Sequence, residues 1–123
     1  MLRRIWYTAR MAQILTTEEL KKKIDNRSDD FYLIDVLPLE SYAARRIPGA
    51  LNIPKGADFV ERFESQTELP KDTEIIVYCS SNTCTASVQS AEQLEKAGYT
   101  NVWHYKDGLA GWKNAGYEFE SDI

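Results

Sequence analysis

Cys79 is the residue of this chain best placed for chemistry, because of the pattern on either side of it. Residues 75–79 read Ile-Ile-Val-Tyr-Cys, an apolar and β-branched run that predicts a buried strand. Apolar residues then recur with helical spacing from Val88, and Gly98 stands where such a helix would end. The pattern therefore predicts that Cys79 lies at the carboxyl end of a strand and faces the amino end of the next helix. Open α/β sheets bind their ligands at such positions.

Backbone amides make this position suitable for a nucleophile. The free N–H groups of a strand-to-helix loop and of the first helical turn point into the bend and stabilise an anion there. We therefore expect the pKa of the Cys79 thiol to be lowered and its thiolate to act as the nucleophile. The plainer alternative is a small buried residue that only ends a strand.

The loop after Cys79 consists of small polar side chains and a second cysteine. We expect it to form the cradle for an anion or a persulfide, and its residues are Ser80, Ser81, Asn82, Thr83, Cys84 and Thr85. Cys84 could resolve a persulfide or a sulfenate on Cys79 by forming a disulfide, which requires Cα atoms within about 7 Å of each other. It could equally be a small residue that packs at the helix start. Both interpretations stay open.

Strands and helices alternate along the rest of the chain. Thr16 and Glu19 have the spacing of a capping box at the start of a helix. Further elements are predicted at residues 31–36 (strand), 39–45 (helical turn), 51–54 (strand), 58–68 (helix), 101–105 (strand) and 107–116 (helix). This alternation predicts an α/β fold, in which helices cover both faces of a mostly parallel sheet.

Two titratable residues on predicted strands are given no part in the chemistry. Asp35 stands near the carboxyl end of its strand, where a carboxylate readily accepts hydrogen bonds from backbone N–H groups. We therefore expect it to be a structural support rather than a general base. His104 stands between Trp103 and Tyr105, and we expect it at the surface or on an edge, outside the mechanism.

Composition narrows the classes of function. A length of 123 residues suffices for one domain with its own core, and the net charge of −4 argues against a nucleic-acid surface. No apolar run is long enough to cross a bilayer, and the single histidine and the lack of a Cys/His cluster argue against a structural zinc site. So few cysteines do not make a disulfide scaffold, which favours a reducing, cytoplasmic location.

The amino terminus differs from the rest of the chain. Arg3, Arg4 and Arg10 are not balanced by any acidic residue before Glu18. We expect residues 1–13 to form a flexible basic tail and residues 14–123 to form the domain.

Four segments together resemble the single-domain rhodaneses, a family of sulfurtransferases. They are "LIDVLPLESYAARRIPGALNIP" (33–54), "IIVYC" (75–79), "AEQLEKAGYTNVWHY" (91–105) and "DGLAGW" (107–112). The resemblance spans about residues 14–117 in the family's order and spacing. It implies a rhodanese-like fold in which Cys79 accepts a sulfane sulfur as a persulfide and passes it to a thiol or to cyanide.

The same resemblance implies the partners of the reaction. The donor would be a small sulfur compound such as thiosulfate or polysulfide, or a protein persulfide, and the acceptor a thiol or a thioredoxin-like protein. No metal and no organic cofactor is implied.

The loop departs from the family pattern, which often has a cation and a glycine in it. Residues 80–85 contain neither, and the segment is about two residues longer than the commonest rhodanese loop. Because a charge-assisted hydrogen bond is about twice as strong as a neutral one, we expect weak turnover of small anionic donors. A polysulfide or a protein persulfide then becomes the favoured donor.

Three other functions compete with the transferase. A thiol redox protein would use the pair Cys79 and Cys84. A non-catalytic rhodanese-like interaction module is typical of chains without the cysteine, and Cys79 is present. A phosphatase of the Cys-x5-Arg type requires an arginine where Thr85 stands, so the charge that stabilises the transferred phosphoryl group is missing.

Overall fold

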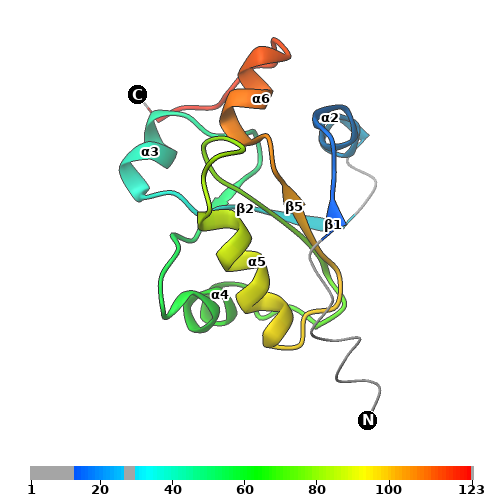
Figure 1. Ribbon diagram of the computed structural model, residues 1–123, viewed down its shortest axis with the longest axis vertical. Coiled ribbons are helices and arrows are strands. Elements are labelled where there is room, and N and C mark those ends of the chain that lie inside the picture. The colour runs from blue at the N-terminus through cyan, green and yellow to red at the C-terminus, as the bar shows by residue number, and fades with distance from the viewer. Residues whose placement is uncertain (1–12, 27–29, 123) are drawn as a thin grey trace.

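A five-stranded parallel sheet forms the centre of the computed structural model, which describes residues 13–26 and 30–122 (Figure 1). The strands pair in the order β1-β5-β4-β2-β3, and every pair is parallel. Their bounds are β1 Gln13–Ile14, β2 Phe31–Asp35, β3 Leu51–Asn52, β4 Glu74–Tyr78 and β5 Val102–Tyr105. Residues 1–12 of the expected basic tail lie outside the described residues.

Helices cover both faces of this sheet, as Figure 1 shows. Their bounds are α2 Thr17–Asn26, α3 Leu39–Ala44, α4 Phe59–Thr67, α5 Ala86–Lys96 and α6 Gly108–Asn114. One apolar cluster joins α4 and α5 to the sheet, and a second joins α2 and α6 to the opposite face. The predicted α/β fold with a parallel sheet is confirmed. Within the described residues, no helix is both long and apolar enough to cross a membrane.

The alternation of side chains along β4 decides which face each residue joins. Ile75, Val77 and Cys79 belong to the cluster under α4 and α5, whereas Ile76 and Tyr78 belong to the cluster under α2 and α6. All five side chains are buried, as expected for a strand covered on both faces. Cys79 therefore continues the apolar face on which α5 packs.

The predicted capping box at the start of α2 is confirmed. The amide of Thr16 donates to Glu19 Oε1 over 2.7 Å, and the amide of Glu19 donates to Thr16 Oγ1 over 3.1 Å. Strand β1 just before it was not predicted from the sequence. It has only two residues, both exposed, so it carries no hydrophobic period that could reveal it.

The first turn of α6 is hydrogen-bonded to the backbone of the cysteine loop, which comprises residues 79–85. The amides of Leu109 and Ala110 donate to the carbonyl oxygens of Cys79 and Ser80 over 3.1 and 2.9 Å. Gly108 permits this approach: its φ is +61°, and a Cβ added there would lie 2.4 Å from the carbonyl oxygen of Cys79. The Gly-rich segment 107–112 thus fixes the backbone of the loop.

Replacing Gly108 should therefore lower the free energy of unfolding more than replacing Gly116, which has a positive φ but no close contact. Gly116 has a φ of +83°, and nothing lies within 4 Å of a Cβ added there. We expect Gly116→Ala to lower the free energy of unfolding by about 1–2 kcal/mol, the cost of a left-handed backbone. Gly108→Ala should cost about 1–3 kcal/mol more, because the loop must move. Urea unfolding of the two variants measures both values, and equal losses would refute the close contact.

Candidate functional site

The cysteine loop runs from the end of β4 to the start of α5 and is held at both ends. Cys79 follows the last residue of β4 directly, and Ala86 is the first residue of α5. Inside the loop, the amide of Cys84 donates to the carbonyl oxygen of Ser81 over 3.1 Å, which closes a tight turn. This turn brings the two cysteines together.

The Cys79 side chain lies inside this bend and is almost fully buried, with 1% of its surface exposed. Its Sγ lies 3.2 Å from Ser87 Oγ and 3.6 Å from the carbonyl oxygen of Cys84, to which the thiol can donate. The amide of Ser87 donates to this sulfur, and the Cys79 thiol can also donate to the Cys84 sulfur. The Cys79 sulfur thus has polar neighbours on the loop side and apolar neighbours on the sheet side.

The expected lowering of the Cys79 pKa is wrong. Burial raises the pKa of this thiol, and the hydrogen bond with Cys84 raises it further. The hydroxyl and amide of Ser87 lower it, but not enough to reverse the effect of burial. Cys79 is therefore a protonated thiol at neutral pH.

Most of the backbone amides that we expected to donate to Cys79 donate to the Cys84 sulfur instead. Its thiol receives hydrogen bonds from Cys79, from the amides of Ala86 and Ser80, and from the Ser80 hydroxyl. These bonds outweigh the opposing effect of burial and lower the pKa of Cys84. The anion-stabilising bend exists, but its donors are divided between two sulfur atoms and favour the second.

Sequence reasoning missed Ser87 and His104, which continue the hydrogen bonds of Cys79. Ser87 is in the first turn of α5 and is fully buried, and its Oγ lies 2.7 Å from His104 Nε2. The expected surface or edge position of His104 is wrong, since only 7% of the residue is exposed and β5 lies between β1 and β4. Burial and the nearby Lys106 charge lower the His104 pKa, so the imidazole is neutral near pH 7.

The other predicted loop residues lie farther from the Cys79 sulfur. Asn82 and Thr85 are exposed, and Ser81 Oγ bonds to Thr83 Oγ1 over 3.0 Å. Ser81 and Asn82 form one wall of a pocket of about 570 Å³, whose other walls are the start of α2 and one side of α6. Neither cysteine lines this pocket.

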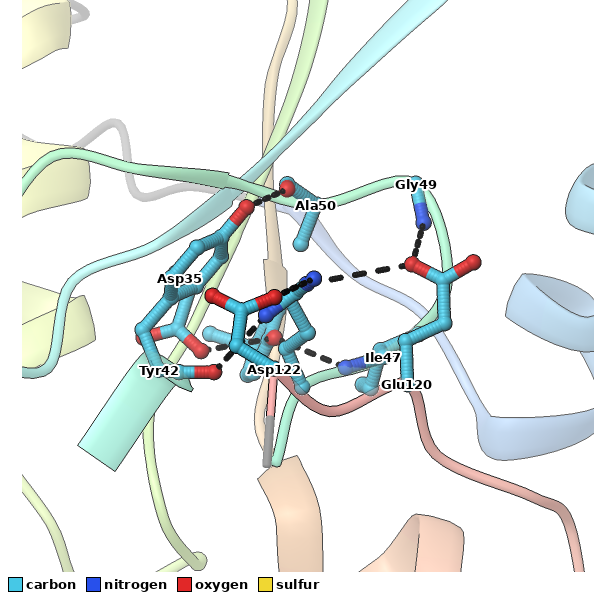
Figure 2. Close-up of polar contacts among 9 residues, drawn as sticks. Asp35, Tyr42, Ile47, Gly49, Ala50, Glu120 and Asp122 are labelled. Carbon is cyan, nitrogen blue, oxygen red and sulfur yellow. Dashed lines mark hydrogen bonds and ion pairs between the residues drawn. The ribbon is translucent and has the colours of Figure 1, made fainter. Parts of the chain in front are cut away.

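Asp35 supports the end of β4 from the neighbouring strand. Its Oδ1 accepts a hydrogen bond from the Leu37 amide over 2.9 Å, and its Oδ2 accepts one from the Tyr78 hydroxyl over 2.8 Å. The Tyr78 oxygen in turn accepts a hydrogen bond from the Ile47 amide over 3.1 Å. Tyr78, which precedes Cys79, is therefore bonded both to Asp35 and to Ile47, two of the residues labelled in Figure 2. Burial raises the pKa of Asp35, although these bonds oppose it.

The segment that follows α6 is bound close to this cluster. Arg46 forms an ion pair with Asp122 at 2.8 Å, and its amide donates to the carbonyl oxygen of Glu120 over 2.9 Å. Tyr42 donates to the carbonyl oxygen of Ala50 over 2.6 Å (Figure 2). Arg46 thus binds residues 120–122 instead of facing the cysteine loop.

Within the ranges that the structure describes, no three His, Cys, Asp or Glu side chains are grouped so as to hold a metal ion. The site itself brings together two adjacent thiols. One is buried, protonated and linked to a serine and a histidine, and the other is partly exposed and surrounded by donors.

Comparisons with known proteins agree with this architecture. The chain is 32% identical over 102 residues to the HTH-type transcriptional regulator Rv0324 of Mycobacterium tuberculosis, covering 83% of this chain and 42% of that protein. It is 32% identical over 99 residues to the putative sulfurtransferase YtwF of Bacillus subtilis, covering 80% of this chain and 88% of that protein.

The fold is shared with solved structures. The thiosulfate sulfurtransferase of Pseudomonas aeruginosa superposes with a TM-score of 0.78 at 27% identity, covering 91% of this chain and 21% of that one. The chain thus spans less than half the length of this enzyme and of Rv0324. The family model described as "Rhodanese-like domain" matches residues 16–115. The chain therefore belongs to the rhodanese-like domain family.

Proposed function

We propose that this protein is a sulfurtransferase that carries sulfane sulfur as a persulfide on Cys79. The observation that carries the proposal is the position of Cys79 at the end of β4, in the bend between strand and helix of a rhodanese-like domain. Relatives named as sulfurtransferases, YtwF among them, support the same class of reaction. Residues 80–85 form the cradle around the transferred sulfur.

The reaction with thiosulfate illustrates the sulfur transfer. The Cys79 sulfur forms a bond to the outer sulfur of the donor, and the bond between the two donor sulfurs breaks. The electron pair of the broken bond leaves on sulfite, the thiol proton is released to a base, and a persulfide anion stays on Cys79. A thiol or a thioredoxin-like protein then takes the outer sulfur and restores the Cys79 thiol.

The charge of the loop affects which sulfur donor reacts best with Cys79. Residues 80–85 contain no lysine or arginine, so a dianion would be held only by amides and hydroxyls. The most reactive donors should therefore be polysulfides or protein persulfides, with thiosulfate weaker. We place this reaction in a reducing, cytoplasmic compartment, where the acceptor thiols are available.

Sulfur uptake by variants of the two cysteines tests the proposal. After brief exposure to polysulfide, wild type and Cys84→Ser should each gain one sulfur atom by intact mass, and a thiol reductant should remove it. Cys79→Ser should gain none, because the accepting sulfur is absent. Thiosulfate should load the protein more slowly than polysulfide does. A gain that persists in Cys79→Ser would refute the assignment of Cys79.

A second candidate function is thiol redox chemistry, favoured by the hydrogen bonds around Cys84. Its thiol has the lowered pKa and contacts the Cys79 thiol, so its thiolate can attack the inner sulfur of a Cys79 persulfide. The attack forms a Cys79–Cys84 disulfide and breaks the persulfide bond, and hydrosulfide leaves with the electron pair. An external dithiol then reduces the disulfide. Cys84 is the resolving thiol in this scheme.

The fate of the loaded sulfur distinguishes the two functions. If Cys84 resolves the persulfide, loaded wild type should release hydrosulfide and reach a mass two hydrogens below that of the reduced protein. Cys84→Ser should keep its extra sulfur under the same conditions. Time-resolved intact mass and a hydrosulfide-trapping reagent follow both products. Equal persulfide lifetimes in the two proteins would exclude the resolving role and leave the transferase alone.

A further inference from the structure

Cys79, Ser87 and His104 form a buried chain of hydrogen bonds that the sulfur transfer can use. Cys79 Sγ lies 3.2 Å from Ser87 Oγ, which lies 2.7 Å from His104 Nε2. We infer that His104 accepts the Cys79 proton through Ser87 when the sulfur attacks its donor. This inference rests on the proposed function, in which Cys79 is the accepting nucleophile.

Three separate elements bring these groups together. Cys79 ends β4, Ser87 is in the first turn of α5, and His104 is on β5. The parallel register pairs His104 with Val77, two residues before Cys79 on β4. Because side chains alternate along a strand, His104 and Cys79 both face α5. The sheet therefore presents the histidine and the cysteine to the same hydroxyl.

The single proton of the Ser87 hydroxyl gives the chain a direction. While Cys79 is a thiol, the hydroxyl donates to a neutral imidazole at Nε2, and the thiol proton can point to the hydroxyl oxygen. During the attack, the thiol proton moves to Ser87 Oγ and the former hydroxyl proton moves to His104 Nε2. The electron pair left on the sulfur forms the new sulfur–sulfur bond, while the sulfur–sulfur bond of the donor breaks and its electron pair leaves with the displaced group. The resulting imidazolium later releases its proton to the displaced leaving group or to water.

The surroundings of Cys79 and His104 favour the protonation states that this transfer requires, a thiol and a neutral imidazole. Lys106 is the charged group whose field reaches His104, and it disfavours the imidazolium. The β1 and β4 partners of His104 are Ile14 and Val77, which carry no charge. Across the bend, the titratable groups are the two thiols. The neutral imidazole of His104 can therefore accept a proton from the Cys79 thiol, which burial keeps protonated.

The hydrogen-bond chain allows the buried Cys79 thiol to react near neutral pH. A thiolate formed in advance would be scarce, because the pKa of Cys79 is raised. Proton transfer to a positioned base during the attack avoids that requirement and typically accelerates a reaction 10²–10⁴-fold. A histidine that only fills space would provide no such acceleration, and the pH profile separates the two cases.

The experiment measures the rate of sulfur uptake on Cys79 from polysulfide between pH 5 and about 9, read by mass spectrometry of the Cys79 peptide. The proteins are wild type, His104→Gln, Ser87→Ala and Ser90→Ala. Gln keeps a hydrogen-bonding group but cannot accept the proton. Ser90→Ala is the matched control, because Ser90 is also a fully buried serine of α5 and its hydroxyl has no hydrogen-bond partner in the described structure.

The relay gives different pH profiles for these proteins. Wild type and Ser90→Ala should be nearly independent of pH around neutrality and should slow at acid pH, as His104 becomes protonated. His104→Gln and Ser87→Ala should be about a hundredfold slower at pH 7. Their rates should rise roughly tenfold per pH unit with the thiolate fraction and approach wild type at high pH. Unchanged rates and profiles in both variants would overturn the relay.

A measurement on the wild type alone guards against a variant that fails to fold. His104 is the only histidine of the chain, so its imidazole signals in NMR spectra are unambiguous. Their titration midpoint should coincide with the midpoint of the acid limb of sulfur uptake, and clearly separate midpoints would contradict the relay. If Cys79→Ser still accepts sulfur on another residue, the proposed function fails instead, whatever the profile of His104→Gln.

Discussion

Parallel pairing between β4 and β5 is the constraint on which the site depends. The register joins Val77 to His104 and Tyr78 to Tyr105, so each face of the sheet receives matched residues from both strands. One face takes Cys79 and His104, and α5 covers it with Ser87. A shift of one residue would turn His104 to the opposite face, toward α2 and α6, and would separate its imidazole from the Ser87 hydroxyl.

Burial and hydrogen bonding act against each other at the two sulfurs. Cys79 continues the core face of β4, so desolvation outweighs its hydrogen bonds with Ser87. Cys84 stands partly exposed at the mouth of the same bend, where the amides of Ser80 and Ala86 favour its thiolate. The loop therefore places its two thiols in different environments: Cys79 is buried and has a raised pKa, whereas Cys84 is partly exposed and has a lowered pKa.

Local patterns in the sequence were sufficient to predict the fold and the position of Cys79. The apolar run before Cys79 and the capping box of Thr16 each act over a few residues, and the four family-like segments can be read directly along the chain. The environment of His104 depends on strand register and on contact across 17 residues with Ser87, which no local pattern contains. The alternation along two adjacent parallel strands could have revealed it, once β4 and β5 were placed side by side.

The thiol pKa values could not be predicted for a related reason. The position of Cys79 between a strand and a helix indicated that amides converge in the bend, but the direction of each N–H depends on the path of the loop. The Cys84 amide turns back to Ser81, and the amides of Ser80 and Ala86 point at Cys84 instead of Cys79.

The anchoring of the loop by α6 has a consequence for how this domain can diversify. Backbone atoms make the anchoring bonds, from Leu109 to Cys79 and from Ala110 to Ser80, while the side chains of Asn82, Thr83 and Thr85 face solvent. New side chains at these three positions would alter the surface that a partner meets without disturbing the sulfur behind it. The backbone atoms that fix the loop and the side chains that a partner would meet are therefore different, so the surface of the loop can change while its anchoring stays the same.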